Sequence, residues 1–496
     1  MKLNKFLWNI YKESEQGRKT IALFENGKIE DILGDFLGDY PVKPDEIETW
    51  VSVFIDLDTF TTIPKKLNGE EAVHFFDEIV EKGIILTFND NEIEDATLND
   101  AGSMLGLIPS ISMWLYTNYP EYFKPYLFIS RFQLLTNIAD TFDIELPVVP
   151  LKRYKKERVK YYWQLCKVFN AFQIENELTH YEFCAFLYDF APKYLSQSET
   201  TVIELPQPSQ VWLVGGDKYG VDFEFLDNPN PGVTSHWQGN EDTKRGDIVI
   251  MYCLAPRSCI HSIWRATADG IADPFFHFYS NIYIGEGQKV EPIHLKELKS
   301  DSYFSTHPLV RKNLQGVNGY QFNSADYDTL LKLLKSKGDK NHLPQLFSYS
   351  FTPNKLLLNE RDVELMLIEP LILRLGFSST DWVRQLSLRM GRGERNYPDY
   401  AFISKTEKGF EAAKMLIEAK FWIKTNRELE ETFKQTWSYA LRLEATTLII
   451  ADKDAVWIYK KENGAFVRTN YVKKYWKELE QPDEFNKVFK LIGKKN

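Results

Sequence analysis

The 496-residue chain lacks several features that would assign it to a class at once. No stretch approaches the roughly 18 uninterrupted apolar residues of a membrane span, so we expect no membrane partner. Its four cysteines have no metal-ligand spacing, which argues against a zinc site or a disulfide framework and favours reduced thiols in a cytoplasmic protein. The N-terminal segment is basic and partly apolar, but Asn9, Tyr11 and Lys12 interrupt its short apolar core, so we expect no signal peptide.

An excess of positive charge is also missing. With 60 basic and 70 acidic residues the formal net charge is −10, which argues against indiscriminate coating of nucleic acid but permits a local basic groove. The densest basic run spans residues 152–162, where Lys and Arg alternate with Tyr. Two interpretations of this basic run stay open. It forms either a surface that follows a nucleic-acid backbone or the solvated start of a helix after Pro150. No GxxxxGK[ST] phosphate loop occurs, so we expect no ATP-driven translocation.

Length and patterning predict three domains in a multidomain α+β chain, at roughly 150 residues per domain. Residues 1–204 carry apolar recurrences typical of amphipathic helices and predict a helical domain whose role the sequence does not indicate. Residues 205–337 contain short strand patterns and predict a small β-barrel closed by a helix over 324–334. Residues 338–496 alternate between helix and strand patterns and predict an α/β domain. The other expected helices are 70–80, 128–142, 159–172, 182–190, 359–376 and 428–443, and the expected C-terminal strands are 385–390, 399–403, 416–423, 446–451 and 455–459.

The ionisable residues of greatest chemical interest lie in the C-terminal domain. Glu418 and Lys420 are two apart inside the apolar strand pattern over 416–423. A carboxylate and an ammonium on a core strand are costly unless they have partners or a task. Asp399 on the preceding strand would complete a metal site that cuts phosphodiesters. Strict alternation over the whole pattern divides it into two faces, one with Ile417, Ala419, Phe421 and Ile423, the other with Glu418, Lys420 and Trp422.

In order along the chain, Pro398-Asp399 and Glu418-Ala419-Lys420 resemble the PD-(D/E)xK nuclease motif. The resemblance covers roughly residues 350–460 and implies a restriction-endonuclease-like α/β fold. It implies that Asp399 and Glu418 are ligands of Mg²⁺ or Mn²⁺, with the Ala419 carbonyl as a possible third. It also implies that Lys420 orients the attacking water and offsets charge on the phosphorane.

Two further features are similar to a subgroup of these nucleases. Gln435 and Tyr439, four apart on the expected helix over 428–443, resemble the QxxxY pattern of nuclease domains in type I restriction subunits. Residues 359–377 are similar to the helix that precedes the motif in that subgroup. The resemblance implies Glu360 as an additional acid, and Glu364, one turn further on the same face, stays an alternative. The ordered set, rather than any one motif, points to a nuclease.

Residues 210–335 resemble the EVE-like members of the PUA/YTH superfamily. The matching segments are 211–216, 235–237, 246–252 and the strand that carries Trp264. Domains of this kind hold a modified base, often flipped from a duplex, in an aromatic slot. The resemblance implies that Trp237 and Trp264 are the slot walls.

Three further residues complete the expected base site. Tyr252 is expected as a third wall, and Asn281 and Ser262 as contacts to the base edge. The alternative, that such aromatics form barrel core, stays open for both slot tryptophans and is our expectation for Trp212.

Both resemblances together imply a modification-dependent restriction endonuclease with DNA that contains a modified base as its partner and Mg²⁺ as its cofactor. Two alternatives stay open, a nuclease that acts on modified RNA and a non-catalytic nucleic-acid-binding protein with a decayed nuclease fold. A further alternative is that Glu418 and Lys420 form a simple salt bridge on a partly exposed strand. A homodimer would supply the two sites that a double-strand cut needs, although no residue identifies its contact.

Overall fold

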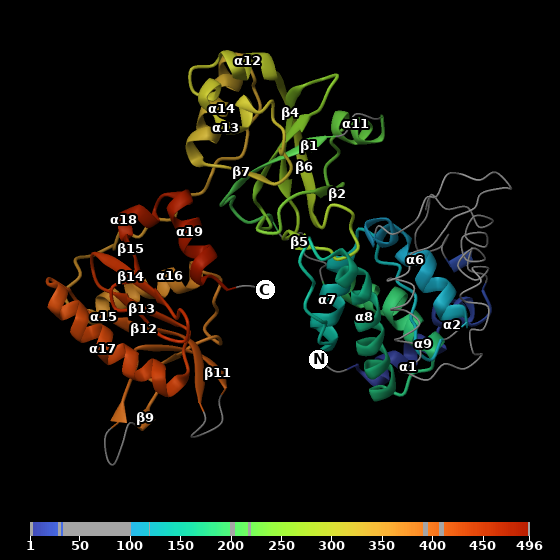
Figure 1. Ribbon diagram of the computed structural model, residues 1–496, viewed down its shortest axis with the longest axis horizontal. Helices are drawn as coiled ribbons and strands as arrows, with labels where there is room; N and C mark the ends of the chain where they lie inside the picture. The colour runs from blue at the N-terminus through green and yellow to red at the C-terminus, as the bar shows by residue number, and fades with distance from the viewer. Residues whose placement is uncertain are drawn as a thin grey trace. The chain divides into compact units, whose positions relative to one another are not determined.

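The computed structural model describes residues 3–27, 31–32, 101–118, 120–198, 204–216, 220–389, 395–405 and 411–494. The expected helix over 70–80 lies outside the described residues. The chain divides into two compact units (Figure 1). Unit 1 comprises Met1–Pro206, Trp212–Asp301 and Ser305–Tyr320, and unit 2 comprises Gln207–Val211, Ser302–Phe304 and Gln321–Asn496. In the described part of the chain, we find no helix with the length and apolar character needed to cross a bilayer.

The N-terminal part of unit 1 is helical, as its apolar periodicity predicts. The expected helix over 128–142 begins only at Phe132, because the preceding residues form a turn in which Ser130 has a φ of 54°. The apolar positions that recur along it are buried against the neighbouring helices. The elements are α1 (Lys5–Glu13), α2 (Glu15–Asn26), α6 (Ala101–Asn118), α7 (Phe132–Phe142), α8 (Lys155–Glu175), α9 (His180–Ala185), the π-helical turn η1 (Phe186–Phe190) and α10 (Ala191–Ser198).

The remainder of unit 1 contains a curled, mostly antiparallel sheet with the strand order β2-β6-β4-β3-β1-β7, and β5 pairs with β6. The sequence predicted a barrel, and the sheet is a half-barrel, since among the described strands no pairing joins β2 to β7. Side chains bridge that seam, because the Asn318 amide donates to Gln238 Oε1 at 2.7 Å. The strands are β1 (Val211–Gly216), β2 (Ser235–Gln238), β3 (Ile248–Cys253), β4 (Cys259–Ala266), β5 (Ile271–Ala272), β6 (Ser280–His294) and β7 (Tyr320–Phe322).

Short helices accompany this sheet. The helix expected to close the barrel, α14, belongs to unit 2, whereas most of the sheet belongs to unit 1. Its start is fixed by a capping box between Asn323 and Asp326, a local pattern that sequence alone can specify. The helices are α11 (Gly220–Asp227), α12 (Leu295–Ser300), η2 (Phe304–Thr306), α13 (Pro308–Arg311) and α14 (Ser324–Ser336).

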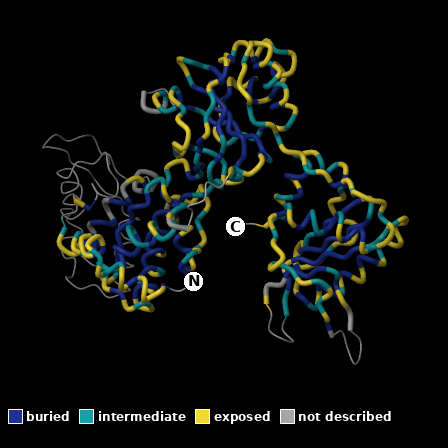
Figure 2. The backbone as a smooth tube through the Cα atoms, turned by 180° about the vertical axis from the view of Figure 1, so that it is seen from behind, coloured by how far each residue is buried: buried dark blue, intermediate teal, exposed yellow. Residues whose placement is uncertain are grey.

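Unit 2 is a three-layer α/β/α arrangement around a sheet of order β15-β14-β13-β12-β11-β8. One sheet face packs against α15, α16, α18 and α19, and the other against α17. Figure 2 shows the strands of this sheet as largely buried. The strands are β8 (Val383–Arg384), β11 (Tyr400–Lys405), β12 (Ala412–Ala419), β13 (Thr447–Ala451), β14 (Ala455–Lys460) and β15 (Val472–Tyr475), with β9 (Leu388–Arg389) and β10 (Arg395–Asn396) in a separate pair. The helices are α15 (Glu360–Val363), the π-helical turn η3 (Glu364–Ile368), α16 (Glu369–Arg374), α17 (Asn426–Leu443), α18 (Trp476–Leu479) and α19 (Pro482–Ile492).

Two predicted strands in unit 2 differ from the structure. The pattern over 385–390 gives only the two-residue β9, since Gln385 has a φ of 48° and breaks the extended chain. Strand β12 ends at Ala419, so the alternation expected as far as Ile423 stops there. The chain turns because the buried Asp452 carboxylate accepts the Ile423 N–H at 2.8 Å.

Candidate functional site

Strand pairing brings Asp399 level with Glu418. Tyr400 on β11 pairs with Ile417 on the antiparallel β12, so the residue before Tyr400 lies opposite the residue after Ile417. The carboxylate of Asp399 then accepts the Ala419 N–H at 2.8 Å. Residues 19 positions apart in the sequence therefore meet at the carboxyl end of β12.

Helix α17 adds two polar side chains to the same place. Strands β12 and β13 are parallel, so the chain must cross back between them, and α17 makes that crossing over one sheet face. Strand alternation puts Glu418 on this face together with Leu416. The Gln435 amide donates to Glu418 Oε1 at 3.0 Å and to the Tyr439 hydroxyl at 2.9 Å. The two residues four apart in the sequence thus form one hydrogen-bonded line to Glu418.

Lys420 and Glu418 form a tight pair. The Lys420 ammonium donates to Glu418 Oε1 and to the Ala419 carbonyl, each at 2.9 Å. Because Glu418 is only 2% exposed, its second oxygen cannot rely on water. That oxygen, Oε2, is buried without any hydrogen-bond partner in the described structure. A buried polar atom left in this way costs about 1–3 kcal/mol, so the site has unused capacity for a donor or a cation.

Burial controls the protonation of these groups. It raises the pKa of Glu418 to about 7, and the nearby Asp399 charge adds to the shift while Lys420 opposes it. Burial also raises the pKa of Asp399. The hydrogen bond from the Ala419 N–H opposes this shift, because it stabilises the charged form. For Lys420 burial alone would lower the pKa, but the charge and hydrogen bond of Glu418 outweigh it and raise the value. The carboxyl groups are held where a positive ion would stabilise their charged forms.

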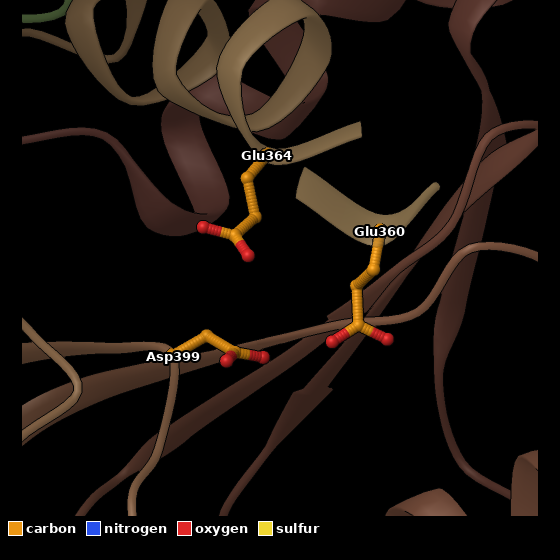
Figure 3. A group of neighbouring side chains, drawn as sticks. All are labelled: Glu360, Glu364 and Asp399. Carbon is orange, nitrogen blue, oxygen red and sulfur yellow. The ribbon is translucent and has the colours of Figure 1, made fainter. Parts of the chain in front are cut away.

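Two glutamates on the helical layer lie close to Asp399. Ligand atoms of Glu360, Glu364 and Asp399 all lie within 4.8 Å of one another, and Figure 3 shows the three carboxyl groups turned toward a common space. Asn359 caps the helix start by accepting the Asp362 N–H at 3.0 Å, which places Glu360 in the first turn. Glu418 is not part of this three-carboxylate group, although the charges of Asp399 and Glu360 both act to raise its pKa.

The two glutamates differ in their partners. Glu364 accepts from Arg361 at 2.6 Å, from Arg384, and from the Tyr400 hydroxyl at 3.2 Å. Two guanidinium groups thus neutralise it. Within the described part of the chain the Glu360 carboxylate has no hydrogen bond or ion pair of its own. Burial raises the pKa of Glu360, and the charge of Lys420 opposes that shift. Of the two alternatives, Glu360 is the carboxylate with neither oxygen engaged in the described structure, whereas the three bonds to Glu364 all reach Oε2.

The residues present fit a hard divalent cation. Carboxylate oxygens are the ligands that Mg²⁺ and Mn²⁺ prefer. Glu360, Glu364 and Asp399 bring such oxygens within 4.8 Å of one another, and Glu418 lies opposite Asp399 on the paired strand. The buried partnerless Oε2 of Glu418 is the observation that favours a missing positive charge. The Ala419 carbonyl, a possible ligand by resemblance, accepts from Lys420 in this structure.

In the half-barrel the two predicted slot tryptophans share one face of the sheet. Trp237 and Trp264 are 7% and 1% exposed and belong to one apolar cluster. Phe225 of α11 stacks on both, with its ring centroid 4.8 Å from that of Trp264 at 20° and 6.3 Å from that of Trp237 at 29°. The space expected for a base is therefore filled by the chain's own phenyl ring.

Ser262 belongs to a hydrogen-bonded chain behind Trp264. The Trp264 indole N–H donates to Ser262 Oγ at 2.7 Å, and an indole nitrogen can only donate. Ser262 Oγ also lies 3.1 Å from His261 Nδ1, and His261 Nε2 lies 3.0 Å from an Asp227 oxygen and 3.3 Å from an Arg257 nitrogen. Burial lowers the pKa of His261, and the Asp227 carboxylate opposes that shift. Ser262 thus serves the core rather than an open cavity.

The other two predicted base contacts lie on the opposite sheet face. Tyr252 stands between Met251 and Cys253, which both belong to the tryptophan cluster, so its side chain points away from it. Asn281 precedes Ile282 of that cluster and likewise points away. Its amide is 1% exposed, with neither polar atom hydrogen-bonded in the described structure. The structure therefore brings Trp237, Trp264 and Ser262 together and separates Tyr252 and Asn281 from them.

Sequence analysis overlooked Phe225 and the two arginines that bind Glu364. Phe225 lies in a Phe-Glu-Phe-Leu pattern that resembles any amphipathic helix. Arg361 is three residues from Glu364, a helical spacing that signals an ion pair. Arg384 had no local signal, because its contact depends on the pairing of β8 with β11.

Comparison with known proteins adds little. No family model matches the chain, and no curated protein matches it. Among solved structures, the NMR structure of Rpa0253 from Rhodopseudomonas palustris matches with 15% sequence identity and a TM-score of 0.22, over 26% of this chain and 94% of that chain. A likeness at that score carries no argument about fold or function.

Proposed function

We propose that the protein is a modification-dependent restriction endonuclease that hydrolyses DNA phosphodiester bonds with Mg²⁺. The observation that carries the proposal is the partnerless Oε2 of Glu418, buried beside Asp399 and Lys420. In the proposed site Asp399 and Glu418 bind the metal ion, and Glu360 is the third acid. A bound divalent ion polarises the scissile phosphate and lowers the pKa of its water.

The chain's own residues then have distinct tasks. Lys420, which donates to Glu418 at 2.9 Å, turns its ammonium toward the attacking water and the phosphate oxygens. Gln435 fixes the Glu418 carboxylate, and Tyr439 fixes Gln435. Arg361 and Arg384 neutralise the negative charge of Glu364. The remaining repulsion among the carboxylates near Asp399 is then small enough for one divalent cation to offset.

The test is a cleavage panel of modified duplex DNA, unmodified duplex DNA, single-stranded DNA and RNA, each with Mg²⁺ and with a chelator. Asp399→Asn should lose at least about a thousandfold in rate, the size expected when a metal ligand is removed from the transition state. Glu431→Gln is the matched control, because its side chain is 61% exposed on α17 and, among the described residues, pairs with Arg427 alone. Equal cleavage by wild type and Asp399→Asn would refute the site, and RNA cleavage alone would refute DNA as substrate.

The half-barrel is the proposed recognition module. A modified base would stack between Trp237 and Trp264 only after Phe225 has left, since that ring stacks on both. Trp237→Ala should abolish the preference for modified over unmodified duplex while leaving the cleavage chemistry in unit 2 intact. An unchanged preference in that variant would remove this face of the sheet from the proposal.

A further inference from the structure

A rigid loop in unit 1 exposes aromatic rings to solvent. The loop joins β5 to β6 and spans residues 273–279. Phe278 is 47% exposed, and its ring lies 5.6 Å from that of Phe276 and 5.0 Å from that of His277. His236 on β2 continues the row, 6.3 Å from Phe276. Phe278, His277 and His236 are exposed and Phe276 is partly buried, so the four rings form one aromatic patch that solvent can reach, as expected of a contact surface.

The main chain of this loop is held at several points. Asp273 Oδ1 accepts the N–H groups of Phe275 at 2.9 Å and Phe276 at 3.1 Å. The Asp273 N–H donates to the Tyr279 carbonyl at 2.7 Å, which closes the loop. Phe275 packs into the helical core, 4.4 Å from Tyr126 between ring centroids. The exposed rings therefore stand on a fixed base and would lose little conformational entropy on binding.

A buried arginine ties the loop to the basic run. Arg158 of α8, 2% exposed, donates from Nε to the Pro274 carbonyl at 2.9 Å and from its terminal nitrogen to the Phe276 carbonyl at 2.7 Å. A third bond reaches the Lys152 carbonyl at 3.4 Å. The aromatic row and the start of the basic run are thus neighbours in space.

The local charge is opposite to that of the whole chain. Residues 152–160 contain six cations and one acid, Glu157, in a protein of net charge −10. Lys152 and Arg153 are exposed, and the Arg153 guanidinium lies 4.7 Å above the Tyr154 ring centroid. Cations beside exposed aromatic rings are the combination that binds phosphates and bases together.

We propose that loop 273–279 and the exposed cations Lys152 and Arg153 form a DNA-contact surface separate from both the tryptophan cluster and the metal site. Phe278 stacks on a base that has left its pair, and the two cations contact backbone phosphates. The inference rests on the proposed function, since it takes DNA as the partner.

The test measures binding of the full-length protein, without metal, to fluorescein-labelled DNA by anisotropy. One probe is a perfect duplex, and the other is the same duplex with one unpaired base. Phe278→Ala should weaken binding to the unpaired-base probe about tenfold and to the perfect duplex much less, because stacking needs an exposed base face. The double variant Lys152→Ala/Arg153→Ala should weaken both probes equally and reduce the salt slope by about two.

Matched controls are available in unit 1. Phe6→Ala removes another phenyl ring, 73% exposed on α1, and Lys296→Ala/Lys299→Ala removes two exposed cations on α12. Both should bind like wild type. Wild-type affinity of Phe278→Ala for the unpaired-base probe would overturn the inference and leave the proposed nuclease standing. A wild-type protein that binds neither probe would overturn this inference, whereas the proposed nuclease is decided separately by the cleavage panel with modified duplex. A changed oligomeric state of Phe278→Ala with unchanged DNA binding would overturn the inference and assign the surface to a second copy of the chain.

Discussion

Two buried carboxyl groups, Asp273 in unit 1 and Glu418 in unit 2, have their pKa raised to about 7, and burial is the main cause in each. Their partners differ. Asp273 accepts two backbone N–H groups of its own loop through Oδ1 and has the Arg158 guanidinium nearby, and neither of its oxygens is among the buried atoms without a partner in the described structure. Glu418 accepts from Lys420 and Gln435 through one oxygen and leaves the other buried without a partner. A raised pKa alone does not separate a structural carboxyl from a functional one, whereas the hydrogen bonds do.

The hydrogen-bond partners of the buried polar atoms also distinguish the tryptophans of the half-barrel from the acidic site. Trp237 donates its indole N–H to the Gly215 carbonyl at 2.9 Å, and Trp264 donates to Ser262. Both rings also stack on Phe225. This cluster is complete without a ligand, unlike the acidic site in unit 2.

The largest expected effect is in unit 2, from Glu418→Gln. The amide keeps the shape but loses the charge, so cleavage of DNA should fall by about a thousandfold or more, or about 4 kcal/mol in barrier height. The free energy of unfolding should change by no more than about 1 kcal/mol, because the amide oxygen keeps the bonds from Lys420 and Gln435 and the lost ion pair offsets the removal of a buried charge. Single-turnover cleavage and chemical denaturation measure the two. A Gln variant that loses both activity and stability would make Glu418 structural, like Asp273.

The next effect, on stability rather than on cleavage, is expected from Asp273→Asn. The pKa of Asp273 is raised from 3.8 to about 7, so the folded chain holds this proton more tightly than the unfolded chain. Its contribution is therefore most favourable below pH 4 and is lost as the pH rises to about 7, by up to about 4 kcal/mol. The Asn variant keeps the acceptor oxygen and should remove this slope. Denaturation at pH 4.5, 6 and 8 checks it, and identical slopes in both proteins would contradict the assigned burial.

The smallest effect is expected from Phe225→Ala. The ring is only partly buried, so its loss should cost about 1–2 kcal/mol, less than for a core phenylalanine. If a base must displace this ring, its removal should raise affinity for duplexes that carry one methylated base and leave unmodified duplexes unchanged. Anisotropy with both duplexes measures the change. Equal affinities in variant and wild type would mean that the tryptophan cluster is only core.

Much of the acidic site could be predicted because its residues follow local rules. The spacing of Glu418 and Lys420 on one strand, and of Gln435 and Tyr439 on one helix, fixes each pair before tertiary contacts form. The structure then brings all four together with Asp399. Which of Glu360 and Glu364 stays without a partner could not be predicted, since the answer depends on Arg384 on another strand.

The base-contact residues show the opposite case. A residue of β3 or β6 faces the tryptophan cluster or the other side according to register, and a shift of one residue reverses the face. Register shifts occur between Met251 and Tyr252 and again within the β4–β6 pairing. Sequence patterns do not record such shifts, so Tyr252 and Asn281 were grouped with residues that they do not meet.

Apolar periodicity and spacings of two to four residues were enough to predict the helical character of the N-terminal part, and the strand and helix that carry the acidic motif. Three features depend on the folded chain instead: Glu418 keeps one oxygen without a partner in the described structure, Phe225 stacks on two tryptophans, and Arg158 joins an aromatic loop to a basic run. Those outcomes depend on contacts between segments far apart in the chain, where register and burial, rather than local pattern, set which atoms meet.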